Sequence, residues 1–288
     1  MSECNCDSGE GSHGESHKRL EKPLVLPIDK VVHEAKDFKT FLFRHKINAK
    51  PGQFVMLWIP RMDEKPFSIS YQDKEKFAVT VFKVGKFTKE LFKLNEGDKV
   101  GIRGPYGNNF KIEGKKVVVV GGGCGTAPMG FLAEELKRAG KDVNFVIGAK
   151  SKDYLLYLER MKKAGIKTFI ATDDGTFGLK GFTTDLLKNI LEKNRIDKVY
   201  SCGPEIMLKF VVEMCEKFSV PCEVSMERYM KCGFGICGQC CVDPLGIRVC
   251  QEGPVFPGEV VKKISEFAKY KRGASGKKEL LGAGGRCE

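Results

Sequence analysis

The chain has 288 residues, of which 42% are hydrophobic, so it is long and apolar enough for two domains with real cores, or three if one is small. No apolar run approaches the roughly 18 to 20 residues that cross a bilayer, and no apolar leader follows Met1, so we expect a protein of the reducing cytoplasm without membrane contact. The net charge of +12 would attract polyanions, but the lysines are scattered along the chain, and we expect no nucleic-acid partner.

The first segment is polar and lacks a periodic apolar pattern. We expect residues 1–21 to form a disordered tail, with metal binding as the less favoured alternative for Cys4, Cys6, His13 and His17. From residue 22 to residue 113 short apolar bursts alternate with turn signals, which predicts strands at residues 40–44, 53–59, 77–83 and 98–103. Short strands at this rhythm are typical of a small antiparallel barrel.

Residues 114–222 alternate between buried-type strands and helices. Strands are predicted at residues 117–120, 143–147, 168–171, 198–201 and 222–225, and helices at residues 131–139, 154–164, 184–193 and 205–218. This alternation is typical of a parallel sheet with helices on both faces. The expected fold class is α/β plus β, with the antiparallel barrel first and the parallel sheet second.

A small cysteine-bearing domain is expected at residues 223–262 and a C-terminal tail at residues 263–288, frayed from residue 271 onward, where Cys287 is expected to be an exposed thiol. An apolar repeat crosses this boundary at Val260, Val261, Ile264 and Phe267. Such a repeat indicates a segment that packs against its own chain or, alternatively, a helix that docks a partner.

In the barrel, Lys65-Pro66-Phe67-Ser68-Ile69 places an aromatic side chain beside a hydroxyl and after a basic residue. This combination could cover a flavin ring and meet a phosphate. Taken alone, the segment is only the start of a strand.

A glycine-rich turn follows the first predicted strand of the parallel sheet. Residues 121–128 read Gly-Gly-Gly-Cys-Gly-Thr-Ala-Pro, ahead of a predicted helix. Glycine allows a phosphate to approach the backbone, and a helix N-terminus offers unpaired N–H donors. Thr126 stands where the usual dinucleotide fingerprint has its third glycine, so the turn alone is a weak signal. We expect nucleotide phosphates at Gly121, Gly122, Gly123, Gly125 and Thr126.

Two further strand ends carry small or polar residues. Asp173 follows the third strand of the parallel sheet, and Cys202-Gly203-Pro204 follows the next. Ligands of open α/β sheets bind at the carboxyl ends of the strands, so these residues predict a nucleotide crevice, with ordinary turn chemistry as the alternative.

Four cysteines near the end of the chain have the spacing C-x4-C-x2-C-x9-C: Cys232, Cys237, Cys240 and Cys250. The first three have the spacing of plant-type 2Fe–2S ferredoxins, and the glycines between them allow backbone N–H groups to turn toward sulfur. Structural zinc is the alternative, although it is typically bound by two separated knuckles. Cys241 could replace its neighbour as a ligand, but the C-x2-C step favours Cys240.

Together these motifs resemble the ferredoxin reductase superfamily, in which an FAD-binding barrel precedes an NAD(P)-binding domain. The segment with the four cysteines, residues 232–250, is called the cysteine loop. With this loop attached, about residues 24–262 look like the family of electron-transfer subunits of heterotetrameric, NADH-linked dihydroorotate dehydrogenases. The resemblance rests on residues 65–69, the turn at 121–128, Cys202-Gly203-Pro204 with Met207, and residues 227–256.

The resemblance implies a 2Fe–2S cluster on the four cysteines, and FAD contacts at Lys65, Pro66, Phe67, Ser68, Val81, Phe82, Lys83 and Thr88. The family normally has Arg where Lys65 stands and Gly-Thr where Phe87-Thr88 stands. Electrons would pass between NAD(H), FAD and the cluster, to or from the flavin of a catalytic subunit, in a two-plus-two heterotetramer that acts on dihydroorotate in pyrimidine biosynthesis. No catalytic proton-transfer residue is expected, because the cofactors carry the chemistry.

Two other functions stay open. One is a subunit of the same build in a ferredoxin:NAD(P) oxidoreductase, a sulfide dehydrogenase or a hydrogenase. The other, of a different class, is a nucleotide-binding module in which the cysteines bind a structural zinc ion. The sequence leaves the choice between NADH and NADPH open as well.

Overall fold

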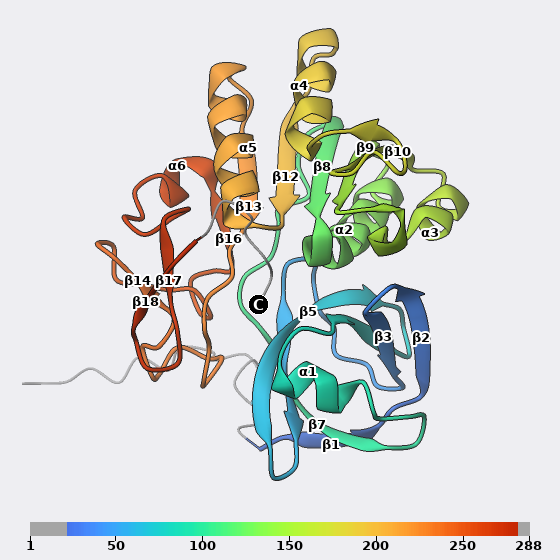
Figure 1. Ribbon diagram of the computed structural model, residues 1–288, viewed down its shortest axis with the longest axis vertical. Coiled ribbons are helices and arrows are strands. Elements are labelled where there is room, and N and C mark those ends of the chain that lie inside the picture. The colour runs from blue at the N-terminus through green and yellow to red at the C-terminus, as the bar shows by residue number, and fades with distance from the viewer. Residues whose placement is uncertain (1–21, 282–288) are drawn as a thin grey trace, which may run out of the picture.

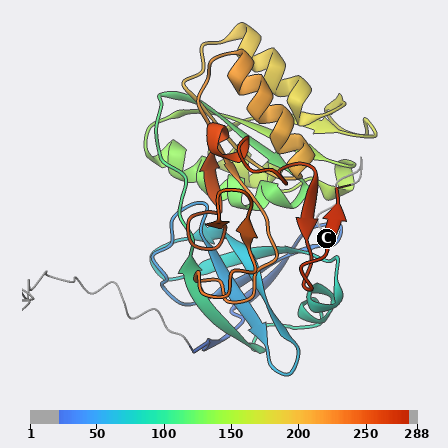
Figure 2. The same ribbon diagram turned by 90° about the vertical axis from the view of Figure 1, so that its left-hand side faces the viewer.

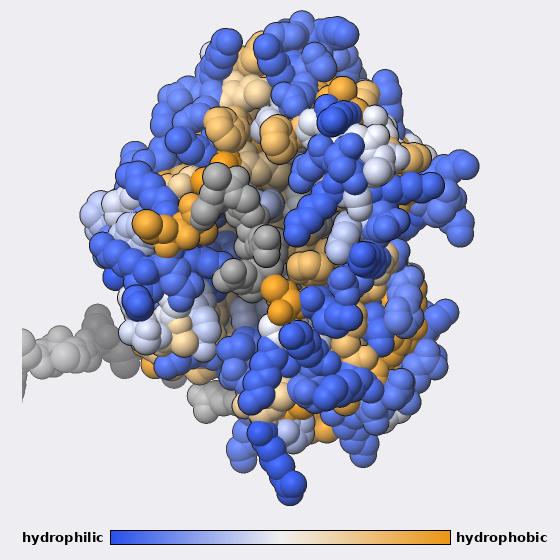
Figure 3. Space-filling model, viewed as in Figure 1, coloured by the Kyte–Doolittle hydropathy of each residue, from blue (hydrophilic) through white to orange (hydrophobic). Residues whose placement is uncertain are grey.

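The computed structural model describes residues 22–281, in which two seven-stranded sheets form two units, one above the other (Figure 1). The expected tail at residues 1–21 and Cys287 lie outside the described residues. Among the residues described, none of the helices combines the length and apolar character that crossing a bilayer requires. Hydrophilic side chains cover much of both units on the face seen in Figure 3.

The first unit is an antiparallel sheet that curls around an aromatic and aliphatic core. Its strand order is β1-β7-β4-β5-β6-β3-β2. The strands are β1 Leu24–Pro27, β2 Lys30–Ala35, β3 Phe38–Phe43, β4 Phe54–Ile59, β5 Asp63–Gln72, β6 Phe77–Phe82 and β7 Lys99–Tyr106, with helix α1 Lys86–Leu91 before β7. The four predicted strands correspond to β3, β4, β6 and β7, and the antiparallel fold of this unit is confirmed.

The second unit is the expected parallel sheet, in the order β11-β10-β9-β8-β12-β13-β16. Only β16 runs antiparallel to its neighbour β13. The strands are β8 Lys116–Gly122, β9 Asp142–Ala149, β10 Lys167–Thr172, β11 Leu179–Lys180, β12 Lys198–Cys202, β13 Cys222–Ser225 and β16 Val255–Pro257. The longer helices are α2 Thr126–Arg138, α4 Thr183–Lys193 and α5 Glu205–Lys217.

Strand β8 shows why this sheet is covered on both faces. Val117 and Val119 belong to the core formed with α2, whereas Val118 and Val120 belong to the core formed with α4 and α5. Side chains alternate across a strand, so an unbroken run of valines serves two helical layers at once. Helix α2 also packs against β5 of the first unit, and its Phe131 enters that unit's core, which joins the two units.

Two helices differ from their predicted bounds. Helix α2 begins at Thr126 rather than at residue 131, because proline is tolerated in a first helical turn and Pro128 therefore does not delay the start. The helix predicted at residues 154–164 is interrupted. Only a 3-10 turn, Lys152–Tyr154, and the short helix α3 Leu158–Lys163 form, since Tyr157 between them adopts a left-handed backbone with φ 64°. The Tyr157 hydroxyl bonds to Thr80 of the first unit, a tertiary contact that local periodicity cannot reveal.

The C-terminal part folds beside the junction of the two units (Figure 1 and Figure 2). It holds the short strands β14 Cys241–Val242 and β15 Ile247–Arg248, helix α6 Gly258–Val261, and a hairpin of β17 Tyr270–Arg272 and β18 Lys278–Leu280. The expectation of fraying from residue 271 is therefore wrong as far as residue 280. An ion pair of Arg272 with Asp243, at 2.7 Å, and a hydrogen bond from Gln239 Nε2 to the Gly273 carbonyl, at 3.2 Å, attach the hairpin to the cysteine loop.

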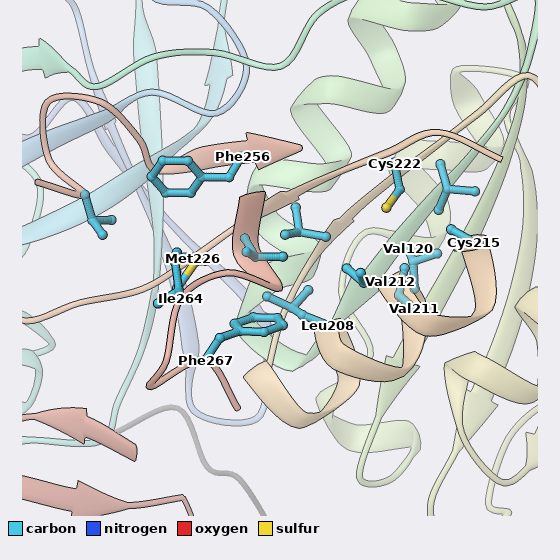
Figure 4. Packing of buried hydrophobic residues seen from close by; sticks show 14 of the residues in the cluster. Val120, Leu208, Val211, Val212, Cys215, Cys222, Met226, Phe256, Ile264 and Phe267 are labelled. Carbon is cyan, nitrogen blue, oxygen red and sulfur yellow. The ribbon is translucent and has the colours of Figure 1, made fainter. Parts of the chain in front are cut away.

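The apolar repeat near residue 264 belongs to the chain's own core. Figure 4 shows Ile264 and Phe267 among the side chains that pack with Leu208 and Met226. Ile264 is only 3% exposed and Phe267 8%. Of the two alternatives for this repeat, packing against its own chain is confirmed.

Candidate functional site

A cleft of about 770 Å³ lies where the two units and the C-terminal part meet. Its walls bring together residues that the sequence singled out separately. The first unit contributes Lys65, Pro66, Phe67, Ser68, Phe82 and Thr88, and the parallel sheet contributes Gly125 and Cys202. The cleft thus joins the barrel motif to the glycine-rich turn and to the end of β12.

Strand β5 presents the barrel motif to the cleft. The Lys65 ammonium pairs with Asp63 at 2.6 Å and donates to the Tyr229 hydroxyl at 3.3 Å. Burial alone would lower the pKa of Lys65, but the bonds to Asp63 and Tyr229 outweigh it and raise that pKa. Phe67 stacks on Phe87 of α1, with ring centroids 5.9 Å apart. A cation and an aromatic face therefore stand side by side on one wall.

Val81, Lys83 and Thr88, three of the residues expected to contact FAD, have side chains that interact within the protein. The Val81 side chain is buried in the barrel core, because it lies on the opposite face of β6 from its neighbour Phe82. Lys83 pairs with Asp37 at 2.9 Å. The Thr88 hydroxyl accepts backbone N–H groups of Val84 and Gly85, at 2.9 and 3.0 Å, and so orders the start of α1 beside the cleft.

The glycine-rich turn is tightly packed against the end of β12. A Cβ on Gly125 would lie 2.3 Å from the Cys202 carbonyl oxygen, and a Cβ on Gly122 would lie 2.5 Å from Met207 Sδ. A Cβ on Gly203 would meet the same methionine at 2.6 Å, and one on Gly121 would meet Thr126 Cα at 2.8 Å. Gly123 faces open space and has φ +53°, a backbone conformation that glycine adopts without strain.

Beyond the turn, the start of α2 faces the cleft through Gly125, Ala127 and Pro128. The Thr126 hydroxyl is buried there, and within residues 22–281 it has no hydrogen-bond partner. A buried hydroxyl without a partner costs free energy, so a polar ligand at this turn would satisfy it.

The same carboxyl edge of the sheet extends past β9 to Asp173, directly after β10. Burial, together with the neighbouring Asp174, raises the pKa of Asp173, and Lys150 opposes that rise. The Asp174 carboxylate already accepts the hydroxyl and backbone N–H of Thr176, at 2.7 and 2.9 Å. Of the two carboxylates, Asp173 is the one that no described donor occupies.

The four cysteines come together as two pairs. Cys232 lies within hydrogen-bonding reach of Cys237, and Cys240 within reach of Cys250. The glycines of the loop, Gly233, Gly235 and Gly238, all have positive φ. This backbone turns N–H groups of residues 234, 236 and 237 toward the Cys232 sulfur. Although burial acts to raise the pKa of Cys232, those N–H groups dominate and lower it to about 6.

The second pair is more buried. A hydrogen bond with Cys250 lowers the pKa of Cys240 to about 7, and the Cys250 N–H donates to the Cys240 sulfur at 3.4 Å. Cys241, in contrast, begins strand β14, and burial raises its pKa. In the part of the chain that is described, no three His, Cys, Asp or Glu side chains are placed to hold one metal ion. Two separate pairs of thiolates instead suit a group with two irons, each bound by two thiolates.

The segment between β13 and the first cysteine forms a wall of the cleft, a role that the sequence analysis did not assign to it. Glu227, Arg228 and Tyr229 line the cleft, as do Arg61, Met62 and Lys86 from the first unit and Lys271 from the hairpin. Desolvation between these walls, together with Glu205, raises the pKa of Glu227 although its side chain is open to the cleft, and Lys271 and Arg228 act against that rise. No periodic pattern marks these residues, because their common position results from folding.

Three family models match the chain in order. Residues 26–111 match the oxidoreductase FAD-binding domain, residues 119–213 the oxidoreductase NAD-binding domain, and residues 227–262 the iron-sulfur cluster binding domain of dihydroorotate dehydrogenase B. These matches bear out the FAD, NAD and iron–sulfur assignments over the zinc alternative.

Solved structures are similar over most of the chain. The NADH-dependent reduced ferredoxin-NADP oxidoreductase, solved in a study of flavin-based electron bifurcation, has a TM-score of 0.75 and 32% identity, covering 85% of this chain and 94% of that one. A ferredoxin NADP+ reductase from Neisseria gonorrhoeae with bound FAD and NADP has a TM-score of 0.60 and 19% identity, covering 68% and 91%. Fold and cleft together define an oxidoreductase of the ferredoxin reductase class with an added iron–sulfur domain.

Curated relatives are similar along nearly their whole length. A "Probable dihydroorotate dehydrogenase B (NAD(+)), electron transfer subunit" from Methanocaldococcus jannaschii is 49% identical over 259 residues, which cover 90% of this chain and 99% of the relative. The equally named protein from Methanothermobacter thermautotrophicus is 43% identical, covering 89% and 97%. The chain belongs to this family of dihydroorotate dehydrogenase B electron-transfer subunits, as the sequence motifs predicted.

Proposed function

We propose that this chain carries electrons between NAD(H) in the cleft and a catalytic flavoprotein subunit, through its flavin and its cysteine loop. The partner subunit would oxidise dihydroorotate in pyrimidine biosynthesis, so that the net flow of electrons runs from dihydroorotate to NAD+. The observation that carries the proposal is the common position of the motifs. The barrel strand and the glycine-rich turn line one cleft, and Met230 of the same lining stands two residues before Cys232, the first of the paired cysteines. When bound, the nicotinamide would exchange a hydride with the flavin, and the flavin and cluster would connect this two-electron chemistry to single-electron transfer.

In this function the first unit holds FAD. Phe67 would cover one face of the flavin ring, Ser68 would hydrogen-bond its edge, and Pro66 would help to keep that wall rigid. Lys65 would act as a point charge toward the diphosphate, since a lysine lacks the fork of the arginine found in the family. Phe82 lines the same wall, Thr88 orders the start of α1, and Val81 and Lys83 would support β6 from behind.

The parallel sheet would hold NAD(H). Gly121, Gly122 and Gly125 permit the turn to pack against Cys202 and Gly203, which leaves the start of α2 open to a diphosphate. The unpartnered Thr126 hydroxyl supports a polar ligand at this position. Gly123 and Pro204 would border the same crevice, and Asp173 would accept the ribose hydroxyls of the adenosine half.

The cluster ligands in this proposal are Cys232, Cys237, Cys240 and Cys250. The pairing of Cys240 with Cys250 supports Cys240 over Cys241, which starts a strand and belongs to neither pair. Cys237 is exposed, and this edge is where a partner subunit would exchange electrons with the cluster.

The partner, the two-plus-two assembly, the cytoplasmic location and the domain bounds at residues 22–113, 114–222 and 223–262 belong to this proposal too. The 32% identity with the ferredoxin-NADP oxidoreductase chain favours one second candidate, a subunit that exchanges electrons with ferredoxin.

Anaerobic purification followed by metal, sulfide and flavin analysis tests the proposal. We expect iron, acid-labile sulfide and FAD in the purified chain, and absorbance changes of both cofactors on addition of NADH. Mixing with the matching catalytic subunit should produce NAD-dependent dihydroorotate oxidation. A verified complex that lacks this activity but reduces ferredoxin would support the second candidate instead, and a colourless zinc protein would contradict both.

A further inference from the structure

Three charged side chains are buried together where three distant segments meet. Arg228 precedes the cysteine loop, Glu205 begins helix α5, and Glu266 lies in the C-terminal segment. Their side chains are 2%, 7% and 0% exposed. The electron path proposed above uses none of them.

Arg228 holds the group together. Its Nε donates to Glu266 Oε1 at 2.9 Å, and its NH1 donates to the Glu205 carboxylate and, at 2.6 Å, to the backbone carbonyl of Glu227. The second oxygen of Glu205 accepts the Ala268 N–H at 2.9 Å. A planar guanidinium can serve partners in several directions at once, which an ammonium cannot do.

The charges of the group balance when the hairpin is included. Glu266 Oε2 lies 3.5 Å from Nε of Arg272, so two cations face two carboxylates. Burying a charge is costly unless it is paired, and removing one partner leaves the others uncompensated. The network therefore stabilises one arrangement of the three segments. If any segment moved away, a buried charge would lose its partner and the free energy of the folded state would rise.

The network connects the edge of the sheet where the nucleotide is proposed to bind with the cysteine loop. Glu205 follows Cys202-Gly203-Pro204 directly. It therefore lies at the carboxyl edge of the parallel sheet, where the nucleotide is proposed to bind, called here the nucleotide edge. Arg228 stands four positions before Cys232. Glu266 lies beyond residue 262, where the match to the iron-sulfur domain family ends. Through Arg272 and Gln239 the hairpin further ties the cysteine loop to this point.

We propose that Arg228, with Glu205 and Glu266, is a positioning site that holds the cysteine loop against the nucleotide edge of the sheet. The inference rests on the proposed function and adds that the loop's place beside the cleft depends on this buried network rather than on the cluster ligands alone. Glu205 and Glu266 lie outside the lining of the cleft, and Arg228 acts on the loop through its ion pairs with them.

Hydrogen exchange on the wild-type holoprotein gives the first test. Segments tied by one network should open together, so the amides near residues 205, 228 and 266 should share one opening free energy. Unrelated opening free energies for the three segments would overturn the proposal. A wild-type chain that takes up no FAD or cluster would instead contradict the proposed function.

The variant Glu266→Gln gives the second test, because it keeps the shape and the acceptor for Arg228 but removes one charge. We expect faster exchange in residues 228–241, because the loop loses part of its attachment. We expect a cluster-reduction rate about tenfold lower, the lower end of the losses seen when groups that support a metal site are removed, while flavin reduction by NADH stays nearly unchanged. The matched control is Glu216→Gln, which breaks an exposed ion pair of Lys262 between α6 and α5 and should change neither.

If Glu266→Gln does not accumulate, the triple variant Arg228→Met, Glu205→Gln, Glu266→Leu removes the three charges together, which proteins tolerate better than an unpaired charge. In either folded variant, exchange and cluster reduction equal to wild type would overturn the proposal. Failure of both variants to fold leaves the wild-type exchange result as the deciding measurement.

Discussion

Arg160 of helix α3 donates a hydrogen bond to the backbone carbonyl of Ser70 in strand β5, at 3.0 Å. The same guanidinium donates two hydrogen bonds to the carboxylate of Glu134 in α2, at 2.7 and 2.9 Å. It also lies over the ring of Tyr157, 4.6 Å from the ring centroid. A single charged group therefore joins the unit of the parallel sheet to the curled sheet.

Replacing Arg160 should loosen this junction. Arg160→Gln removes these hydrogen bonds and leaves Glu134 partly buried. Breaking a buried pair costs about 3 to 5 kcal/mol, and with Arg160 24% exposed we expect a smaller loss, about 2 kcal/mol in the free energy of unfolding. Denaturant titration measures this loss. Arg138→Gln touches the same Glu134 from the surface and should change stability by less than about 0.5 kcal/mol. Equal effects of the two variants would contradict the role of Arg160.

The assignment of cluster ligands predicts a contrast between two cysteines. Cys237→Ser should abolish or distort the visible absorption of the cluster, since one iron loses a thiolate, while FAD stays bound. Cys241→Ser should leave the spectrum nearly unchanged, because Cys241 lies in β14 outside the two pairs. Absorption spectra and iron content of the two proteins make the comparison. Loss of the cluster in the second variant would show that Cys241 is the ligand.

Asp173 should decide between NADH and NADPH. A carboxylate at the end of β10 can accept ribose hydroxyls and repels a ribose phosphate. Asp173→Ser should therefore raise the KM for NADH about tenfold, the value of one charged hydrogen bond, and reduce the discrimination against NADPH. Steady-state reduction of an artificial electron acceptor measures both. Asp174→Ser is the control, because Thr176 already occupies that carboxylate. A KM that changes equally in both variants would argue against this role.

The raised pKa of Glu227 predicts a pH dependence of stability. Desolvation in the cleft is the main cause, with Glu205 adding to it, so the folded state binds a proton more tightly than the unfolded state does. This contribution is fully present below the unfolded value of 4.5 and is lost as pH rises through the folded pKa. Glu227→Gln should therefore gain stability relative to wild type as pH rises from 4.5 toward neutrality. Thermal unfolding at several pH values measures the difference. A difference that stays constant over this range would rule out Glu227 as its source.

The chain's local patterns were sufficient for much of the architecture. Unbroken valines in β8 and alternating helices predicted a doubly covered parallel sheet, and the cysteine spacing predicted the cluster loop. Each of these signals is local, because strand period, helix period and ligand spacing are written within a few residues. The errors lay where a distant contact outweighs local preference. Tyr157 breaks a predicted helix because its hydroxyl binds Thr80, and the hairpin at residues 270–280 forms because Arg272 finds Asp243.

Local sequence was enough to identify the groups that the chain carries: a nucleotide turn, a barrel motif and a set of thiolates. How these groups combine depends on the folded chain. Folding brought Lys65 to Tyr229, placed Glu227 and Lys271 on the wall of one cleft, and divided the cysteines into two pairs. Burial of apolar surface fixes the packing of strands and helices. Packing then brings together side chains that are far apart along the chain, and no local pattern encodes that proximity.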